Sequence, residues 1–77
     1  MTSEKLKEAV QAQPFRPFRV HLGGGRALDV VHPEFIAISP SGRTAALYGR
    51  KDELEIIDVF MVQSIEFLTG RTRRGRR

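Results

Sequence analysis

The chain has 77 residues and no cysteine, so disulfide bonds and thiolate metal sites are excluded. This length predicts one small domain, which buries only about 60% of the surface that its unfolded chain exposes. No stretch approaches the roughly 20 apolar residues of a membrane span, and the mixed charges of the first ten residues are unlike a secretory signal. We therefore expect a cytoplasmic protein.

The formal net charge of +4 comes from 13 basic and nine acidic side chains, and it is unevenly placed. Five arginines lie close together near the C-terminus: Arg71, Arg73, Arg74, Arg76 and Arg77. Without these five arginines, residues 1–70 contain eight basic and nine acidic side chains. We expect a nearly neutral domain over residues 1–68. A flexible basic tail is expected over residues 69–77, because this segment has no apolar side chain to bury.

Residues 3–13 are predicted to form an amphipathic helix. Three apolar side chains recur at the spacing of one helical face: Leu6, Ala9 and Val10. Ser3 is expected to cap the first amides. Pro14 is expected to end the helix, because the residue before a proline disfavours the α conformation.

After the helix, apolar and polar residues alternate with a period of two, which predicts strands. The glycines 23–25 predict a hairpin turn, since each can adopt a positive φ. The side chains expected to face inward on this hairpin are Phe18, Val20, Leu22, Leu28 and Val30. A dinucleotide or P-loop would need a helix after its glycines, so GGGR is interpreted as a turn and not as a phosphate loop.

Pro33 is expected to end the strand that follows the first hairpin turn. A second group of short strands is predicted after it. These strands are predicted in FIAIS, TAALYG, LEII and SIEFL, with a tight turn in PSGR and a single helical turn started by Asp58. Phe35 and Phe67 are expected to face the core with Phe18. The sequence thus predicts a mainly β fold, a small barrel of five or six short antiparallel strands with one N-terminal helix.

Residues 13–67 resemble a set of short bacterial proteins. Their pattern is approximately QPFxPFxxHLxDGRxxxVxHPEFxxxSPxGRT, followed by an acidic loop and EIIDxxxVxxIE. The specific parts of the match are HPEF and SPxGRT, whereas Gly24 stands where those proteins usually have Asp. The resemblance implies that the chain groups with these proteins, but it implies no activity.

The order of the expected elements is also similar to that of Sm-like and other SH3-like small barrels. These have a leading helix, a meander of short strands and a short turn before the closing strand. The signature residues of Sm-type RNA pockets are not recognisable here. The likeness therefore implies a shape and not a function.

No pattern in the sequence indicates catalysis, a cofactor or a metal site. His21 and His32 are the only histidines, and no convincing carboxylate partner accompanies them at a known metal spacing. The serines lack a nucleophile motif, and the acidic residues fall at turns, caps or outward strand positions. We expect a protein that is not an enzyme.

The arginine-rich segment predicts binding to nucleic acid, with RNA or single strands favoured. Arginine binds phosphate through a planar fork, but side chains on a mobile segment do not read base edges. Residues 71–77 would provide the affinity. The arginines that could assist on the domain itself are Arg16, Arg19 and Arg26.

The alternative function is a protein-interaction module, self-associating or an adaptor, with no role in nucleic-acid binding. The segment DVFMV is too apolar to be wholly exposed, so it either completes the core or meets another subunit. The expected interface residues are Val59, Phe60 and Met61.

Overall fold

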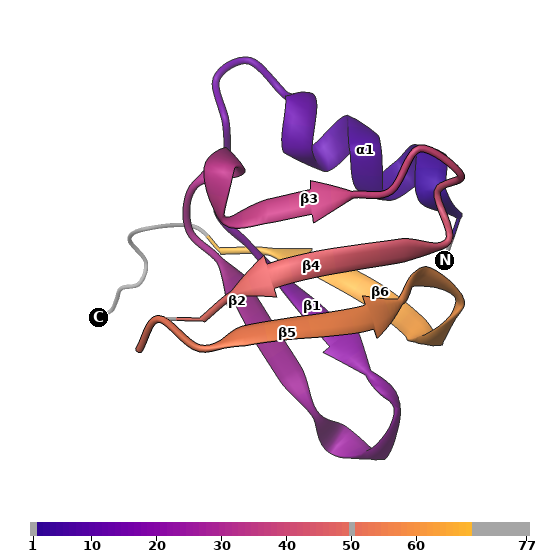
Figure 1. Ribbon diagram of the computed structural model, residues 1–77. Helices are drawn as coiled ribbons and strands as arrows, with labels where there is room; N and C mark the ends of the chain where they lie inside the picture. Colours follow the sequence, from indigo (N-terminus) through magenta and orange to yellow (C-terminus); the bar gives the residue numbers. More distant parts are fainter. Residues whose placement is uncertain (1, 50, 69–77) are drawn as a thin grey trace.

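The computed structural model describes residues 2–49 and 51–68. This part of the chain contains one helix and two three-stranded antiparallel sheets, with strand orders β2-β1-β6 and β3-β4-β5 (Figure 1). The regular elements are α1 (Ser3–Gln11), β1 (Phe18–Leu22), β2 (Ala27–Val30), β3 (Ile36–Ile38), β4 (Thr44–Tyr48), β5 (Leu54–Asp58) and β6 (Val62–Phe67). A mainly β fold with an N-terminal helix is confirmed.

The described strands do not close into a single barrel. The chain leaves β2, passes through the short 3₁₀ turn Pro33–Phe35, and starts a separate sheet at Ile36. Pro33 has no backbone N–H to donate, so strand pairing is interrupted where the chain changes sheet. In Figure 1 the sheet of β3, β4 and β5 lies in front of the other sheet, with α1 above β3.

The core lies between the two sheets and under α1. On β1 the expected alternation is confirmed, because Phe18, Val20 and Leu22 are buried while Arg19 and His21 are only half-buried. Twelve apolar side chains from the helix and both sheets form the core cluster: Leu6, Ala9, Phe18, Val20, Leu22, Val30, Ile36, Ala45, Leu47, Ile57, Val59 and Val62. Removal of these apolar side chains from water is expected to be the main favourable contribution to the free energy of folding.

Helix α1 ends two residues earlier than expected and has a different cap. The Oγ1 atom of Thr2, and not that of Ser3, accepts a hydrogen bond from the backbone N–H of Lys5 at 3.3 Å. Leu6 and Ala9 are buried as predicted from their spacing. A Cβ atom at Gly42 would lie 2.6 Å from Ser3 Oγ, so the helix start packs closely on the turn between β3 and β4.

The expected inward direction is wrong for Phe35. Ile36 lies opposite Leu47 in the β3–β4 pair, and both are buried, so Phe35 and Ala37 project from the other face. The alternation along this strand was predictable, but the choice of the buried face depends on the packing of the two sheets.

Phe67 is also more exposed than expected. It lies opposite Phe18 on the inner face, with the two ring centroids 6.3 Å apart, yet 38% of Phe67 is accessible. Among the described strands, β6 pairs with β1 only, so Phe67 is the last residue of an edge strand.

The turns form where the sequence predicts them. Gly24 and Gly25 have φ values of 76° and 79°, and they lie in a short 3₁₀ turn between β1 and β2. The 3₁₀ turn Val59–Met61 is capped by Asp58, whose Oδ1 atom accepts a hydrogen bond from the Phe60 N–H at 2.9 Å. This cap directs the chain from β5 into β6.

Candidate functional site

An exposed apolar surface runs along β5 and the turn after it. The exposed fractions of its four large side chains range from 54% to 69%. We call this surface the apolar ridge, and its members are Leu54, Ile56, Phe60 and Met61. Large exposed apolar groups that lie together mark interaction sites more often than single exposed ones.

The ridge follows from strand alternation and from the Asp58 cap. Leu54 and Ile56 lie on the face of β5 opposite to buried Ile57, so they cannot reach the core. The capped turn then buries Val59 and leaves Phe60 and Met61 outside. Two of the three expected interface residues are thus on the surface, whereas Val59 is only 1% exposed and belongs to the core.

Strand β5 is also an edge strand. Among the described residues it pairs with β4 and with no second strand. Ile56 and Met61 line a shallow groove of about 180 Å³, whose other side is formed by Leu22, Gly23 and Arg26 from the first hairpin. An edge strand carries backbone groups that another strand can pair with, so edge and ridge together form one candidate surface.

A basic group borders the ridge at Phe60. The guanidinium carbon of Arg43 lies 5.8 Å from the centroid of the Phe60 ring, within the range of a weak cation–π contact. Arg43 also accepts a hydrogen bond through its backbone oxygen from Val59 N–H at 2.8 Å. These two contacts attach the turn to the start of β4.

The arginines expected to help bind nucleic acid are engaged within the domain. Arg19 Nε lies 2.7 Å from Asp29 Oδ1, and Arg19 Nη2 lies 3.3 Å from Oδ2, which is a two-pronged contact. The hydrogen bond and charge of Asp29 raise the pKa of Arg19 above its ordinary value, with a smaller contribution from Glu66. Arg26 forms an ion pair with Glu55.

Arg16 is placed differently from the other two. Its guanidinium carbon lies 4.3 Å from the centroid of the Phe67 ring, a closer cation–π contact than that of Arg43. Arg19 and Arg26 thus each contact a carboxylate, whereas Arg16 contacts an aromatic ring. The expected tail arginines, residues 71–77, lie outside the described residues.

The outer face of the first sheet has a row of alternating charges. Arg19 is the direct cross-strand neighbour of Asp29 on one side and of Glu66 on the other. His21 Nε2 lies 2.9 Å from Glu66 Oε1. The sequence indicated that these side chains point outward, but it did not show that they meet.

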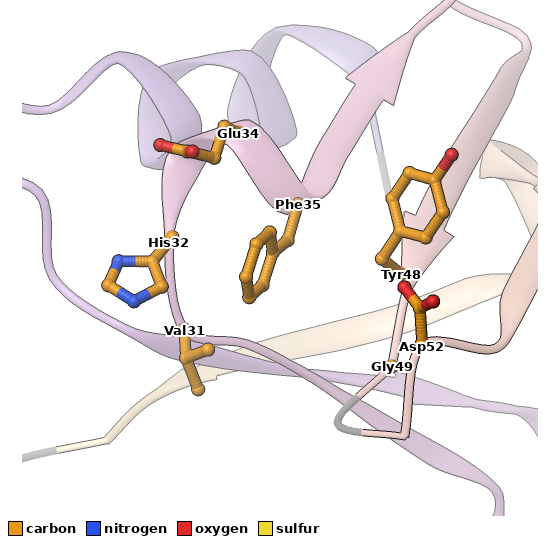
Figure 2. A pocket seen from close by; sticks show the side chains of 7 residues that line it. All are labelled: Val31, His32, Glu34, Phe35, Tyr48, Gly49 and Asp52. Carbon is orange, nitrogen blue, oxygen red and sulfur yellow. The ribbon is translucent and has the colours of Figure 1, made fainter.

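A second candidate site is an open hollow of about 790 Å³ at the end of the sheets where β2 leads into β3 (Figure 2). It is lined by Val31, His32, Glu34, Phe35, Tyr48, Gly49 and Asp52. The rings of His32 and Phe35 meet edge to face with centroids 5.1 Å apart. In Figure 2 the Phe35 ring stands on one side of a gap and Tyr48 with Asp52 on the other.

The sequence does not predict this hollow, because its lining comes from separate segments. Residues 31–35 follow β2, Tyr48 ends β4, and Asp52 lies in the next turn with a positive φ of 67°. No short motif links these positions. Only the outward direction of Phe35, which the sequence did not settle, brings its ring to the hollow.

The described residues include no group of three or more histidine, cysteine or carboxylate side chains that could hold a metal ion. No described helix has the length and apolar character needed to cross a membrane. No protein-family model matches the chain, and neither the curated proteins nor the solved structures contain a significant match to it.

Proposed function

We propose that this protein is a non-enzymatic interaction module that associates with a second copy of itself through the apolar ridge. The observation that carries the proposal is the exposure of Leu54, Ile56, Phe60 and Met61 next to the edge of β5. Four large apolar side chains that are each more than half exposed form a patch on the order of 400 Å², within the roughly 300–600 Å² of the largest apolar patch on a typical monomer. This is about half of the roughly 800 Å² per partner in a standard interface.

The free edge of β5 among the described strands also favours association of two copies. Antiparallel pairing of two β5 edges about a two-fold axis joins the two sheets and uses the same surface on both copies. With Ile56 opposite its own equivalent, Glu55 lies opposite Ile57, so like charges do not face each other. Two ridges then lie side by side on one face of the joined sheet and are partly removed from water.

The test is the concentration dependence of the molecular mass, measured by sedimentation. We expect a mass above the 8.7 kDa of one chain, falling toward this value on dilution. Ile56→Asp and Phe60→Asp should shift the equilibrium to the monomer, because each places a charge in the apolar contact. Ser64→Asp is the matched control, since Ser64 is exposed on the outer face of the other sheet.

A clean monomer at millimolar concentration would contradict the proposal. So would equal dimerisation of Ser64→Asp and Ile56→Asp. Circular dichroism of each variant distinguishes loss of association from loss of folding.

Nucleic-acid binding through residues 71–77 is the second candidate, with RNA or single strands favoured. The concentration of positive charge in this segment supports it, since the rest of the chain is nearly neutral. Arg19 and Arg26 are paired with carboxylates. In this proposal the affinity for nucleic acid therefore comes mainly from the five arginines of the segment. The order of helix, hairpin and meander also supports the comparison with Sm-like and SH3-like folds, which remains part of this proposal.

This candidate is tested with poly(U) as the probe and salt as the variable. Five phosphate contacts on a single strand give a slope of about −3.5 in log K against log salt. A chain without residues 70–77 should lose most of the affinity and most of the slope. Unchanged affinity would exclude the arginine segment as the binding element.

A further inference from the structure

The hollow of Figure 2 has the chemistry of a site for an arginine side chain. Its lining combines the carboxylates of Glu34 and Asp52 with the rings of Phe35 and Tyr48. Carboxylates bind a guanidinium through paired hydrogen bonds, and aromatic faces stack on its plane. Among the described lining residues none is a lysine or an arginine that would compete with such a ligand.

The arrangement of these groups suits a planar cation. In Figure 2 the gap lies between the Phe35 ring and the side chains of Tyr48 and Asp52. Tyr48 is 46% exposed, so its ring is accessible to a ligand. Aromatic rings and the Asp52 carboxylate are both groups that attract a guanidinium, and both border the gap.

This chain itself contains a segment whose charge is opposite to that of the carboxylates in the hollow. Residues 71–77 hold five arginines and no acidic side chain. The described lining residues of the hollow include two acidic side chains, Glu34 and Asp52, so they are opposite in charge to this segment. Several arginines can exchange in one binding position, so a segment with five of them occupies such a site more often than a single basic side chain would.

The end of the described chain lies near the hollow. Leu68 N–H donates a hydrogen bond to the Pro17 oxygen at 2.8 Å. Phe18, the first residue of β1, pairs with Val30, the last residue of β2. The register therefore brings Pro17, just before β1, close to Val31, which lines the hollow. Two strand spacings, about 10 Å, therefore separate Leu68 from the near side of the hollow.

The remaining segment is long enough to cross this distance. Nine residues follow Leu68, and an extended chain of nine residues spans up to about 30 Å. Arg71 is only the third residue after Leu68. Every arginine of the segment is thus within reach of the hollow in the same molecule.

We propose that residues 71–77 bind to this hollow in the same chain, with an arginine side chain held between Phe35 and Tyr48 and paired with Asp52. Bound in this way, the segment shields part of its charge from an external polyanion. The inference does not require self-association, and it predicts an intramolecular competitor for the second candidate function.

The experiment compares the amide NMR spectra of the full chain and of a chain ending at Leu68. The shortened chain keeps the whole hydrophobic core, whose members lie between Leu6 and Val62. At low salt we expect different amide shifts at Phe35, Tyr48, Gly49 and Asp52. At 1 M NaCl, where the screening length is about 3 Å, we expect these differences to disappear.

Variants of the full chain identify the carboxylate. Asp52→Asn should move the shifts of the hollow toward those of the shortened chain, and Asn tolerates the positive φ of this position. Glu4→Gln is the matched control, because Glu4 is an exposed acid in the first turn of α1, away from the hollow. Tyr48 is the only tyrosine and the chain has no tryptophan, so its fluorescence gives an independent readout.

Identical shifts of the hollow in the full and shortened chains at low salt would overturn the proposal. Differences that grow with protein concentration would also overturn it, since binding within one chain is independent of concentration. Self-association is distinguished by the same dilution series, because it shifts residues of the apolar ridge instead.

Discussion

The guanidinium Nε of Arg19 lies 2.7 Å from Asp29 Oδ1, and the two residues are direct partners across β1 and β2. With Glu66 opposite Arg19 on β6, the outer face of the first sheet is a row of paired charges. By contrast, the outer side of β5 carries the apolar ridge. The two sheets therefore present surfaces of different chemistry to a partner.

Removing the charge of Asp29 should have a small effect on stability. We expect Asp29→Asn to lower the free energy of unfolding by no more than about 1 kcal/mol, because partly exposed ion pairs contribute about 0–1 kcal/mol. Arg19 is 39% exposed at its side chain, which favours the lower half of this range. Urea denaturation of Asp29→Asn, Arg19→Gln and the double variant measures the coupling. A coupling energy above 2 kcal/mol would contradict this expectation.

The Arg19–Asp29 pair should not make stability depend on pH near neutrality. Asp29 raises the pKa of Arg19, so its stabilising effect is complete below the ordinary arginine pKa and is lost only as the pH rises through the raised value. We expect the difference between the wild type and Arg19→Gln to be constant between about pH 6 and pH 9. Urea denaturation across this range tests it, and a difference that changes with pH would assign another titrating group to the site.

Truncation of Phe18 should be the most damaging single change on β1. Phe18 is fully buried between the sheets, and Phe→Ala in a core costs about 3–5 kcal/mol. Phe60→Ala is the matched control, because Phe60 is 69% exposed and the same atoms are removed. Denaturation in urea at a concentration where both are monomeric should show a large loss only for Phe18→Ala. Equal losses would mean that Phe60 packs more tightly than its exposure indicates.

Two glycine substitutions should separate backbone strain from packing. Gly42 and Gly24 have φ values of 79° and 76°, so alanine is strained to a similar degree at both. At Gly42 the new Cβ would also lie 2.8 Å from Ser3 Cβ, whereas nothing lies within 4 Å at Gly24. We expect Gly42→Ala to be the more destabilising by about 1 kcal/mol or more, the scale of overpacking costs. Thermal denaturation of both variants measures the difference, and equal losses would show that α1 yields at its first turn.

The Asp58 cap offers a prediction about the ridge. Asp58→Ala removes the acceptor of the Phe60 N–H, which costs about 1 kcal/mol for a typical cap. Asp58→Asn keeps an oxygen acceptor and should cost less. Amide exchange at Phe60 should accelerate in Asp58→Ala and remain nearly normal in Asp58→Asn. No acceleration would mean that packing of Val59 alone holds the turn.

Local features of the sequence were sufficient to predict most of the turns and elements. Gly24 and Gly25, Pro33 and Asp58 each act through their own backbone conformation or a hydrogen bond two residues away. The alternation of β1 likewise predicted its buried residues. Such features depend on neighbours along the chain, so they can be read without a structure.

The tertiary structure decided what the sequence left open. Alternation defines two faces along this segment, but only the position of the other sheet shows that Ile36 is buried and Phe35 only half-buried. The pairing of Arg19 with Asp29, and the hollow at Tyr48, likewise join residues from separate segments. Contacts of this kind depend on distances in space, which periodicity along the chain does not specify.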